Sequence, residues 1–392
     1  MFGTLHSRRR SPVAALGVAT ALVLAACGSD ASSDDADDPS ATEAAASDTS
    51  SDDSEVPTTQ APAEPDPPAV TEPTTDTPAP ADTDPPSDTE PSDTEPSDTE
   101  PPDTEPEFPR TVTHALGETT IPEAPLRIVA LDGSLVDAVL ALELDLIGYT
   151  TFRDPEGDLP AYFGDALTEF AAEADWVGDL TAPNLEEIAL LQPDLILSAA
   201  VRHEGIYDQL SQIAPTVLTE SAGGGWKDSI RLAAEATGRD ELAETLLTGF
   251  ESRAADLGAA INEAAGDPEI SVVRVVDVIR LYNPVSFSGT VLEDAGLARP
   301  ESQRSTDDFI TIISEEELDL ADGDVVIYTV FDDPAVEDAV ADLQAGPLWE
   351  TLGAVQRGDV HRVSDEEWMS GVGLFGAQII LDDLAEIFGV TN

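Results

Sequence analysis

The sequence predicts an α/β protein with two lobes, each built on a central, mostly parallel sheet, joined by a single long α-helix. Short apolar runs alternate with helical stretches in 109–239, one uninterrupted helical pattern follows over 240–265, and the alternation resumes in 266–392. Strand–helix alternation is typical of parallel sheets with helices on both faces. We therefore expect an N-terminal lobe, a connecting helix and a C-terminal lobe over these three ranges.

In the N-terminal lobe, apolar runs bounded by polar or turn residues indicate strands, and apolar residues three or four apart indicate helices. Asn184 is the expected N-cap of one of these helices. We expect strands at 127–131, 146–149, 194–198 and 215–218, and helices at 134–142, 185–191 and 203–213.

The connecting helix is indicated by one apolar stripe. Its members recur every three or four residues: Leu242, Leu246, Phe250, Ala254, Leu257 and Ile261. This spacing places them on one face of a helix. At about 1.5 Å per residue the helix reaches nearly 40 Å, which is roughly the width of a domain.

The C-terminal lobe repeats the strand and helix signals. Ser314 followed by Glu317 predicts a capping box at a helix start, and Gly296 is an expected helix end. We expect strands at 270–276, 324–328 and 359–363, and helices at 288–295, 314–320 and 371–388.

The first 26 residues have the features of an export signal. Three arginines at 8–10 precede a mostly apolar run at 12–26, which is too short for a comfortable membrane span. Residues 24–28, Leu-Ala-Ala-Cys-Gly, resemble a bacterial lipobox. The resemblance implies cleavage before Cys27 and a lipid anchor on that residue, the only cysteine of the chain. A plain secretory peptide cut nearby and a retained anchor helix are the alternatives.

The segment 27–108 has the composition of a tether. From Ser29 to Phe108 it contains no Lys, Arg or His, and a proline-led five-residue repeat fills 86–105. Like charges repel and proline disfavours helix and sheet, so we expect an extended, disordered spacer. With the anchor, it predicts a domain held outside the cell membrane, in an envelope of Gram-positive type.

The charge of the chain excludes some partners. With 80 acidic and 17 basic residues the formal net charge is −63, and Lys227 is the only lysine. Nucleic acid is excluded because phosphate binding needs clustered Lys and Arg. An anionic membrane surface would repel the body, and self-repulsion favours a soluble monomer.

Residue patterns for catalysis or metal binding are absent from the sequence. The four histidines have no spacing typical of a metal site, and no G-x-S-x-G or P-loop motif occurs. We therefore expect no enzyme, no resident metal and no cofactor.

Isolated arginine and aromatic residues follow the predicted strands instead. In α/β sheets, ligands bind beyond the carboxyl ends of the strands. The alternative role of each tryptophan is packing in the core, and that of each arginine is a solvated surface position. The candidate ligand-binding residues are Arg202, Trp226, Arg280, Tyr282 and Trp368.

Six segments, in this order, resemble the ABC-transporter substrate-binding proteins for ferric siderophores. They are 127–134 (RIVALDGS), 177–188 (VGDLTAPNLEEI), 191–197 (LQPDLIL), 207–216 (YDQLSQIAPT), 286–290 (SFSGT) and 347–353 (PLWETLG). The resemblance implies two lobes joined by one long helix, and a shallow cleft whose arginine and aromatic side chains hold the ligand. It places the five candidate residues at that cleft. It implies no metal ligands from the protein, because the siderophore already fills the coordination sphere of iron.

The same resemblance implies docking on a membrane permease, which works with an ATPase, through one glutamate in each lobe. The matching positions are Glu186 and Glu316, and acidic residues flank both, so the adjacent glutamates are the alternatives. Haem or a cobalamin-type corrinoid is the alternative ligand, with Tyr282 or His203 as the axial group that haem needs. A tethered cell-surface interaction module is the alternative from another class.

Overall fold

The structure is a computed structural model that describes residues 107–152 and 157–391. These residues fall within one compact unit. The predicted signal segment, Cys27 and nearly all of the tether lie outside the described residues. No helix in the described part of the chain is both long and apolar enough to cross a membrane.

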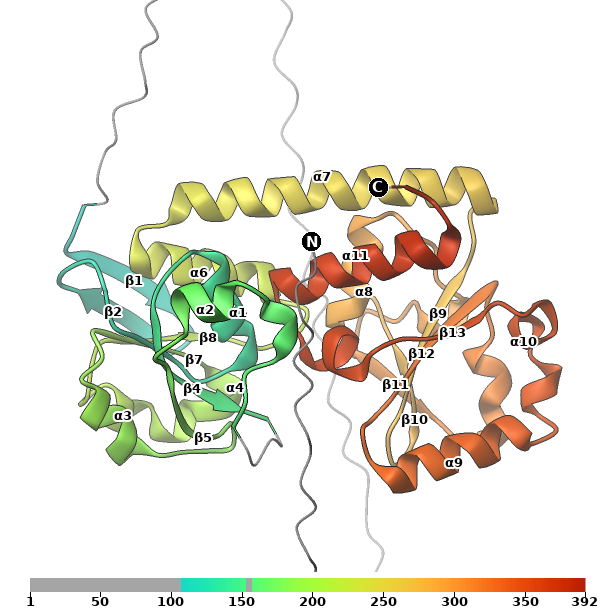
Figure 1. The fold of residues 1–392 in the computed structure, drawn as a ribbon, viewed down its shortest axis with the longest axis horizontal. Helices are drawn as coiled ribbons and strands as arrows, with labels where there is room; N and C mark the ends of the chain where they lie inside the picture. Colours follow the sequence, from blue (N-terminus) through green and yellow to red (C-terminus); the bar gives the residue numbers. More distant parts are fainter. Residues whose placement is uncertain (1–106, 153–156, 392) are drawn as a thin grey trace, which may run out of the picture. The chain divides into compact units, whose positions relative to one another are not determined.

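The N-terminal lobe is built on a six-stranded sheet in the order β6-β5-β4-β3-β7-β8 (Figure 1). Every neighbouring pair is parallel except β5 and β6, so the predicted parallel sheet is confirmed. The strands are β3 (Ile128–Ala130), β4 (Leu146–Thr151), β5 (Asp175–Asp179), β6 (Ala182–Pro183), β7 (Leu195–Ala199) and β8 (Thr216–Thr219).

A hairpin that was not predicted precedes this sheet. Its strands β1 (Arg110–His114) and β2 (Gly117–Ile121) pair antiparallel with each other. The N–H of Ala115, in the turn, donates to the carbonyl of Leu218 in β8 at 3.0 Å. The hairpin therefore fastens the start of the folded body to the edge of the N-terminal lobe.

Helices cover both faces of the N-terminal sheet. Asn184 caps α3 as predicted, accepting the N–H groups of Glu186 and Glu187. The continuous helix predicted at 203–213 is wrong, because His203 leaves helical geometry and the chain forms three short turns there. The helices are α1 (Gly133–Ala141), α2 (Ala166–Phe170), α3 (Leu185–Leu191), α4 (Ala200–His203), α5 (Tyr207–Leu210) and α6 (Trp226–Thr237), with 3₁₀ turns η1 (Ala161–Phe163) and η2 (Glu204–Ile206).

The long helix α7 (Asp240–Ala265) runs across both lobes, with the boundaries that the sequence predicts (Figure 1). Its inner face differs slightly from the predicted stripe, since Ala243 and Leu247 are fully buried while Leu242 and Leu246 are half-buried. Near the far end, a Cβ on Gly258 would lie 1.6 Å from the carbonyl oxygen of Ala295. Glycine there lets α7 pack directly against the end of α8.

The C-terminal lobe has a mixed five-stranded sheet in the order β11-β10-β9-β12-β13. Strands β9, β12 and β13 are parallel, and β10 runs antiparallel between β9 and β11. Strands β10 and β11 were not predicted from the sequence. The strands are β9 (Ile270–Val275), β10 (Ile279–Tyr282), β11 (Ile310–Ile313), β12 (Val325–Val330) and β13 (Val360–Arg362).

The α-helix predicted at 314–320 is wrong in type, because this segment forms the 3₁₀ helix η4. Its capping box between Ser314 and Glu317 is confirmed. The elements are α8 (Phe287–Asp294), α9 (Pro334–Ala345), α10 (Gly353–Arg357), α11 (Leu374–Phe388), the 3₁₀ turns η3 (Glu301–Gln303), η4 (Glu315–Ala321) and η5 (Trp349–Thr351), and the π-helical turn η6 (Glu366–Ser370).

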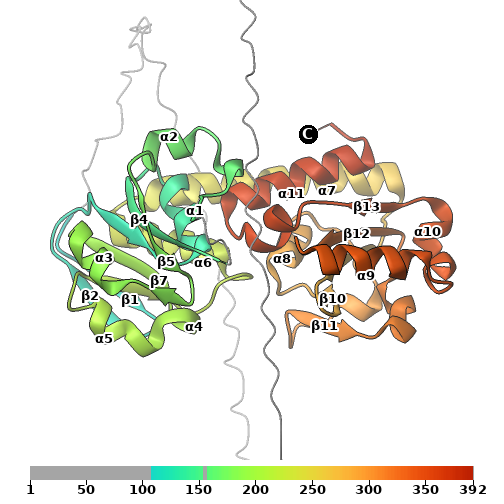
Figure 2. The ribbon, with the colours of Figure 1, turned by 60° about the horizontal axis from the view of Figure 1, so that its bottom comes forward.

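The largest hydrophobic core extends through both lobes. It takes buried side chains from α1 and α6 of the first lobe, from α7, and from α8 and α11 of the second. In both views α11 lies beside α7, and it also contacts α1 and α8 (Figures 1 and 2). The lobes thus share packed side chains as well as the connecting helix.

Candidate ligand-binding site

The carboxyl ends of the parallel strands locate the candidate site. In the N-terminal lobe, Asp132 follows β3 and Arg202 follows β7, the neighbouring strand. In the C-terminal lobe, Arg274 lies near the end of β9 and Asp365 follows β13. Ligands of open α/β sheets bind beyond these ends. Each lobe therefore presents an arginine and an aspartate at the edge of the sheet where a ligand is expected.

Arg202 is the exposed arginine of the N-terminal lobe. Its side chain is 40% exposed, and its Nε lies 3.4 Å from Oδ2 of the buried Asp132. Oδ1 of Asp132 accepts the backbone N–H and the hydroxyl of Ser134, at 3.0 and 2.7 Å, as the N-cap of α1. The aspartate is thus held by the start of a helix, and it orients a guanidinium whose outer N–H groups face solvent.

The short helix α4, which carries Arg202, is anchored by the neighbouring His203. Nε2 of this buried imidazole lies 2.7 Å from the carbonyl oxygen of Leu180, so Nε2 carries the proton and donates. Nδ1 then accepts the hydroxyl of Ser198 at 2.6 Å. Burial lowers the pKa of His203, which favours this neutral form.

Arg274 is a half-buried arginine of the C-terminal lobe that was not predicted from the sequence. Its Nε and Nη2 donate to the two oxygens of Asp365, at 2.8 and 2.6 Å. The hydroxyl of Thr329 donates to the same carboxylate at 2.8 Å, and Nη1 lies 3.3 Å from the hydroxyl of Tyr282. The bidentate geometry is a strong form of charge-assisted pair. Arg274 lies inside a strand pattern, so only its partner 91 residues away distinguishes it.

Arg280 lies beside Arg274, on the neighbouring strand β10. In the strand register, Arg280 lies opposite Arg274 on β9 and opposite Ile312 on β11, so the three side chains project from one face of the sheet. Its Nη2 lies 3.4 Å from Asp277, and its buried Nε has no hydrogen-bond partner among the described residues. Ile312 is 59% exposed, so an unused donor lies beside an exposed apolar side chain.

A hollow of about 540 Å³ opens between the lobes at the same end of the sheets. Its volume lies in the range of small-molecule sites. None of the five residues predicted from the sequence lines it, so the hollow and the arginines are separate features. The lining residues are Tyr149, Asp158, Leu159, Pro160, Ala161, Leu167 and Ala171 from the first lobe and Glu366 from the second.

The two predicted tryptophans lie in the core. Trp226 and Trp368 are each 0% exposed, and Tyr282 is 7% exposed. Trp226 packs edge-on against Phe250 of α7 and Phe287 of α8, and Nε1 of Trp368 donates to Asp383 at 2.7 Å. Because neither indole offers a face to solvent, the structure corrects their interpretation as ligand platforms, and we treat both as packing residues. Arg202 and Arg280, whose side chains are 40% and 30% exposed, remain the candidates.

Glu186 and Glu316, the predicted docking residues, are both exposed on the surface of their lobes. Glu186 lies in the first turn of α3 and Glu316 in the first turn of η4. The adjacent Glu317 accepts the N–H and hydroxyl of Ser314, so its carboxylate is occupied by the cap. This leaves Glu315, Glu316 and Asp319 as the exposed acidic side chains of η4 that are not used by the cap.

Comparison with known proteins assigns the family. The family model described as periplasmic binding protein matches residues 128–366, and the chain belongs to this family. A probable siderophore-binding lipoprotein of Bacillus subtilis, YfiY, is 37% identical over 290 residues, covering 71% of this chain and 87% of its own length. The achromobactin-binding periplasmic protein of Dickeya dadantii is 29% identical over 274 residues, covering 68% and 88%.

Among solved structures, Staphylococcus aureus SirA complexed with staphyloferrin B is similar, with a TM-score of 0.66 and 28% identity. The match covers 72% of this chain and 99% of SirA. The two-lobed α/β fold predicted from the sequence is therefore confirmed, and the chain is a binding protein of this family rather than an enzyme.

Proposed function

We propose that this chain is the substrate-binding component of an ABC importer, and that it captures a ferric siderophore outside the cell and delivers it to a membrane permease. The observation that carries the proposal is the 37% identity to a siderophore-binding lipoprotein over 290 residues, which include both lobes. The similarity to SirA, solved with staphyloferrin B, supports the same ligand class.

The chemistry of the candidate site supports this proposal. A ferric siderophore supplies the ligands of its own iron, so the binding protein needs donors and contact surface rather than metal-ligating side chains. Among the described residues, no group of three or more His, Cys, Asp or Glu is placed to hold a metal ion. Arg202 and Arg280 offer planar N–H donors to the negatively charged chelating oxygens.

Haem is less compatible with these residues. Both ring nitrogens of His203 are used inside the N-terminal lobe, and the hydroxyl of Tyr282 contacts Arg274. Neither residue therefore offers a free axial ligand, which haem capture needs. This contrast favours a siderophore over haem as the ligand of the same fold.

Anchoring and delivery complete the proposal. We infer a lipid anchor on Cys27, a monomeric body held on the outer face of the cell membrane, and an envelope of Gram-positive type. Glu186 and Glu316 would meet arginines of the permease, one contact for each lobe. Their exposure and their positions in different lobes support this arrangement.

The test is a titration of residues 27–392, carrying Cys27→Ser, with ferric siderophores of hydroxamate, catecholate and carboxylate chemistry. Binding is followed by isothermal calorimetry, with the iron-free siderophores, haem and cyanocobalamin as controls. We expect saturable binding by at least one ferric siderophore and none by its iron-free form. Binding of haem or cyanocobalamin alone would move the function to those ligands, and binding of none of them would contradict the proposal.

A further inference from the structure

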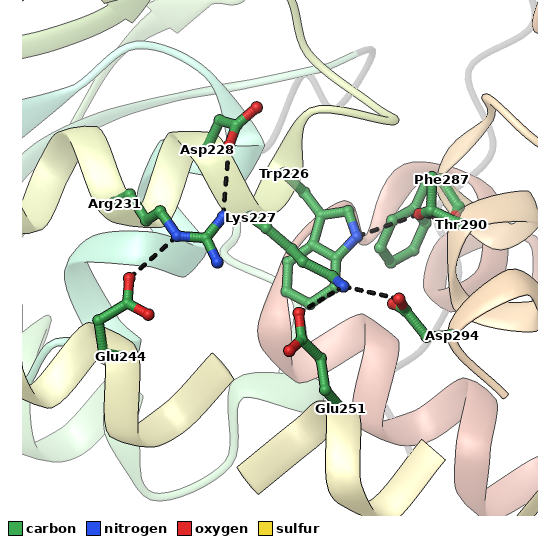
Figure 3. A network of polar contacts seen from close by, with 9 residues as sticks. All are labelled: Trp226, Lys227, Asp228, Arg231, Glu244, Glu251, Phe287, Thr290 and Asp294. Carbon is green, nitrogen blue, oxygen red and sulfur yellow. Dashed lines mark hydrogen bonds and ion pairs between the residues drawn. The ribbon is translucent and has the colours of Figure 1, made fainter. Parts of the chain in front are cut away.

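The only lysine of the chain lies where three helices meet. Lys227 is in the first turn of α6, beside the middle of α7 and the end of α8 (Figure 3). Its Nζ lies 2.9 Å from a carboxylate oxygen of Glu251 on α7 and 2.7 Å from one of Asp294 on α8. One ammonium thus joins the N-terminal lobe, the connecting helix and the C-terminal lobe.

The preceding residue makes a second link between the same helices. Nε1 of Trp226 donates to the hydroxyl oxygen of Thr290 on α8 at 3.2 Å. That hydroxyl donates in turn to the carbonyl of Phe287 at 2.8 Å, so its hydrogen is already committed and its oxygen is free to accept. The indole also packs edge-on against Phe250 and Phe287, with ring centroids 5.1 and 6.2 Å away.

The chain that leads into α6 is pressed against the other lobe as well. A Cβ built on Gly224 would lie 2.1 Å from the carbonyl oxygen of Val285, which precedes α8. Only glycine allows the two backbones to approach this closely. Backbone, indole and ammonium thus form one continuous contact, which we call the seam, between residues 224–227 and 285–294.

Lysine suits this position better than arginine would. An ammonium is a compact charge with three donors, whereas a guanidinium is a planar fork. Nζ of Lys227 lies 5.8 Å from the ring centroids of both Trp226 and Phe250, so the rings and the two carboxylates surround it. Burial lowers the pKa of Lys227 and the carboxylates of Asp294 and Glu251 raise it, with a net rise that keeps the ammonium charged.

We propose that Lys227 is a positioning residue for ligand binding: through the seam it sets the placement of the two lobes about α7, and thereby holds the ligand cleft in its binding arrangement. Bending or twisting about the middle of α7 changes the separation of α6 and α8, which the Lys227–Asp294 pair and the Trp226–Thr290 hydrogen bond span directly. The expected change in ligand affinity rests on the proposed function, whereas the expected change in lobe placement does not.

The same helix supplies a matched control. Arg231, one turn after Lys227, pairs with Glu244 on α7 at 3.0 Å and with Asp228 on α6 at 3.3 Å, and neither of these partners belongs to the C-terminal lobe (Figure 3). Arg231→Met therefore removes a cation between α6 and α7 without touching the seam. Glu251→Gln weakens the α7 contact of Lys227, whereas Asp294→Asn weakens the contact that crosses between lobes.

The lobe separation is measured by electron spin resonance between labels on Asp208→Cys and Asp338→Cys, two exposed positions on different lobes, in the Cys27→Ser chain. We expect Lys227→Met and Asp294→Asn to broaden the distance distribution of the folded protein, Lys227→Arg to restore part of the narrow distribution, and Arg231→Met and Glu251→Gln to leave it narrow. If the binding arrangement falls to about a tenth of the population, the affinity falls about tenfold.

A purely structural role would lower the melting temperature of Lys227→Met without broadening the distribution, and this result would overturn the proposal. Thr290→Val is the second test, because it removes only the acceptor of the Trp226 hydrogen bond. A narrow distribution in both variants would reject the seam. Failure of the unmodified protein to bind any ferric siderophore would reject the proposed function, while the distance measurement would still decide the seam.

Discussion

The carboxylate of Asp137 in α1 accepts the backbone N–H of Leu374, the first residue of α11, at 2.6 Å. The N–H of Phe375 reaches its second oxygen at 3.0 Å. A side chain of the first lobe thus caps the last helix of the chain, 237 residues away. The four first N–H groups of a helix have no partner within it, so the buried start of α11 depends on this carboxylate.

The Asp137 contact predicts a pH-dependent stability. Burial raises the pKa of Asp137 from 3.8 to about 8, although the N–H groups of Leu374 and Phe375 act in the opposite direction. The folded protein therefore holds a proton that the unfolded chain loses near pH 3.8. The contribution of Asp137 is fully present below that pH and is lost as the pH rises through about 8.

We expect urea unfolding to show that stability falls more steeply between pH 5 and 8.5 in the natural protein than in Asp137→Asn. At low pH the variant is destabilised by about 1–3 kcal/mol, because an amide nitrogen faces one of the N–H groups that a carboxyl oxygen accepted. Equal pH slopes for the two proteins would contradict the assignment.

The burial of Trp368 predicts a separation of stability from binding. Trp368→Phe keeps most of the packing and removes the hydrogen bond to Asp383. We expect a loss of about 1–2 kcal/mol of stability and an unchanged dissociation constant for the ferric siderophore. Chemical unfolding and calorimetry measure the two quantities. A tenfold weaker affinity with unchanged stability would restore the interpretation of this indole as a ligand platform.

Arg202 predicts a loss of affinity without a loss of stability. Arg202→Ala removes a 40% exposed donor that pairs with Asp132, and we expect binding about tenfold or more weaker because a hydrogen bond to a charged group contributes about 1.5–3 kcal/mol. Arg304→Ala is the control, since Arg304 pairs with Glu269, before the opposite end of β9. Similar affinities in both variants would remove Arg202 from the site.

The net charge of −63 predicts an unusual salt dependence. The acidic body repels an anionic ferric siderophore at long range, and at about 0.15 M salt the Debye length shortens to about 8 Å. We expect the association rate, measured by stopped-flow fluorescence, to rise with sodium chloride. A neutral ferric siderophore is the control and should show little change. A falling rate for the anionic ligand would indicate that local arginines outweigh the net charge.

Glu186 and Glu316 predict a defect in delivery rather than in capture. We expect Glu186→Arg with Glu316→Arg to abolish uptake of radioactive ferric siderophore by whole cells and to leave the dissociation constant of the purified protein unchanged. Glu169→Arg, on α2, is a control for charge reversal elsewhere on the surface. Normal uptake in the double variant would reject both positions as docking residues.

In the described part of the chain, the alternation of apolar runs located seven of the thirteen strands and the helices α1, α3, α7, α8 and α11, because burial against a sheet imposes its period on the sequence itself. The long helix was predicted to the residue over 240–265. Strands β1, β2, β5, β6, β10 and β11 and helices α2, α6, α9 and α10 were not predicted. The helix at 203–213 was predicted as continuous because the sequence does not reveal that His203 is drawn into contacts with Ser198 and Leu180.

The residues of the candidate site could be predicted only in part from the sequence. Position after a strand selected Arg202 and Arg280, which stay candidates, but it could not separate an exposed aromatic ring from a buried one. Trp226 and Trp368 follow the same rule of position and are fully buried. Exposure depends on the helices that pack over a residue, and those come from distant parts of the chain.

The sequence by itself determined the two-lobed α/β architecture, the connecting helix, the acidity and the class of binding protein, because each follows from local periodicity, composition or a run of matching segments. The tertiary structure alone decided that Arg274 pairs with Asp365, that Asp137 caps α11 and that Lys227 joins α6, α7 and α8. These contacts join residues that are 91, 237 and up to 67 positions apart. Their partners are chosen by how whole elements pack, which no local pattern of residues records.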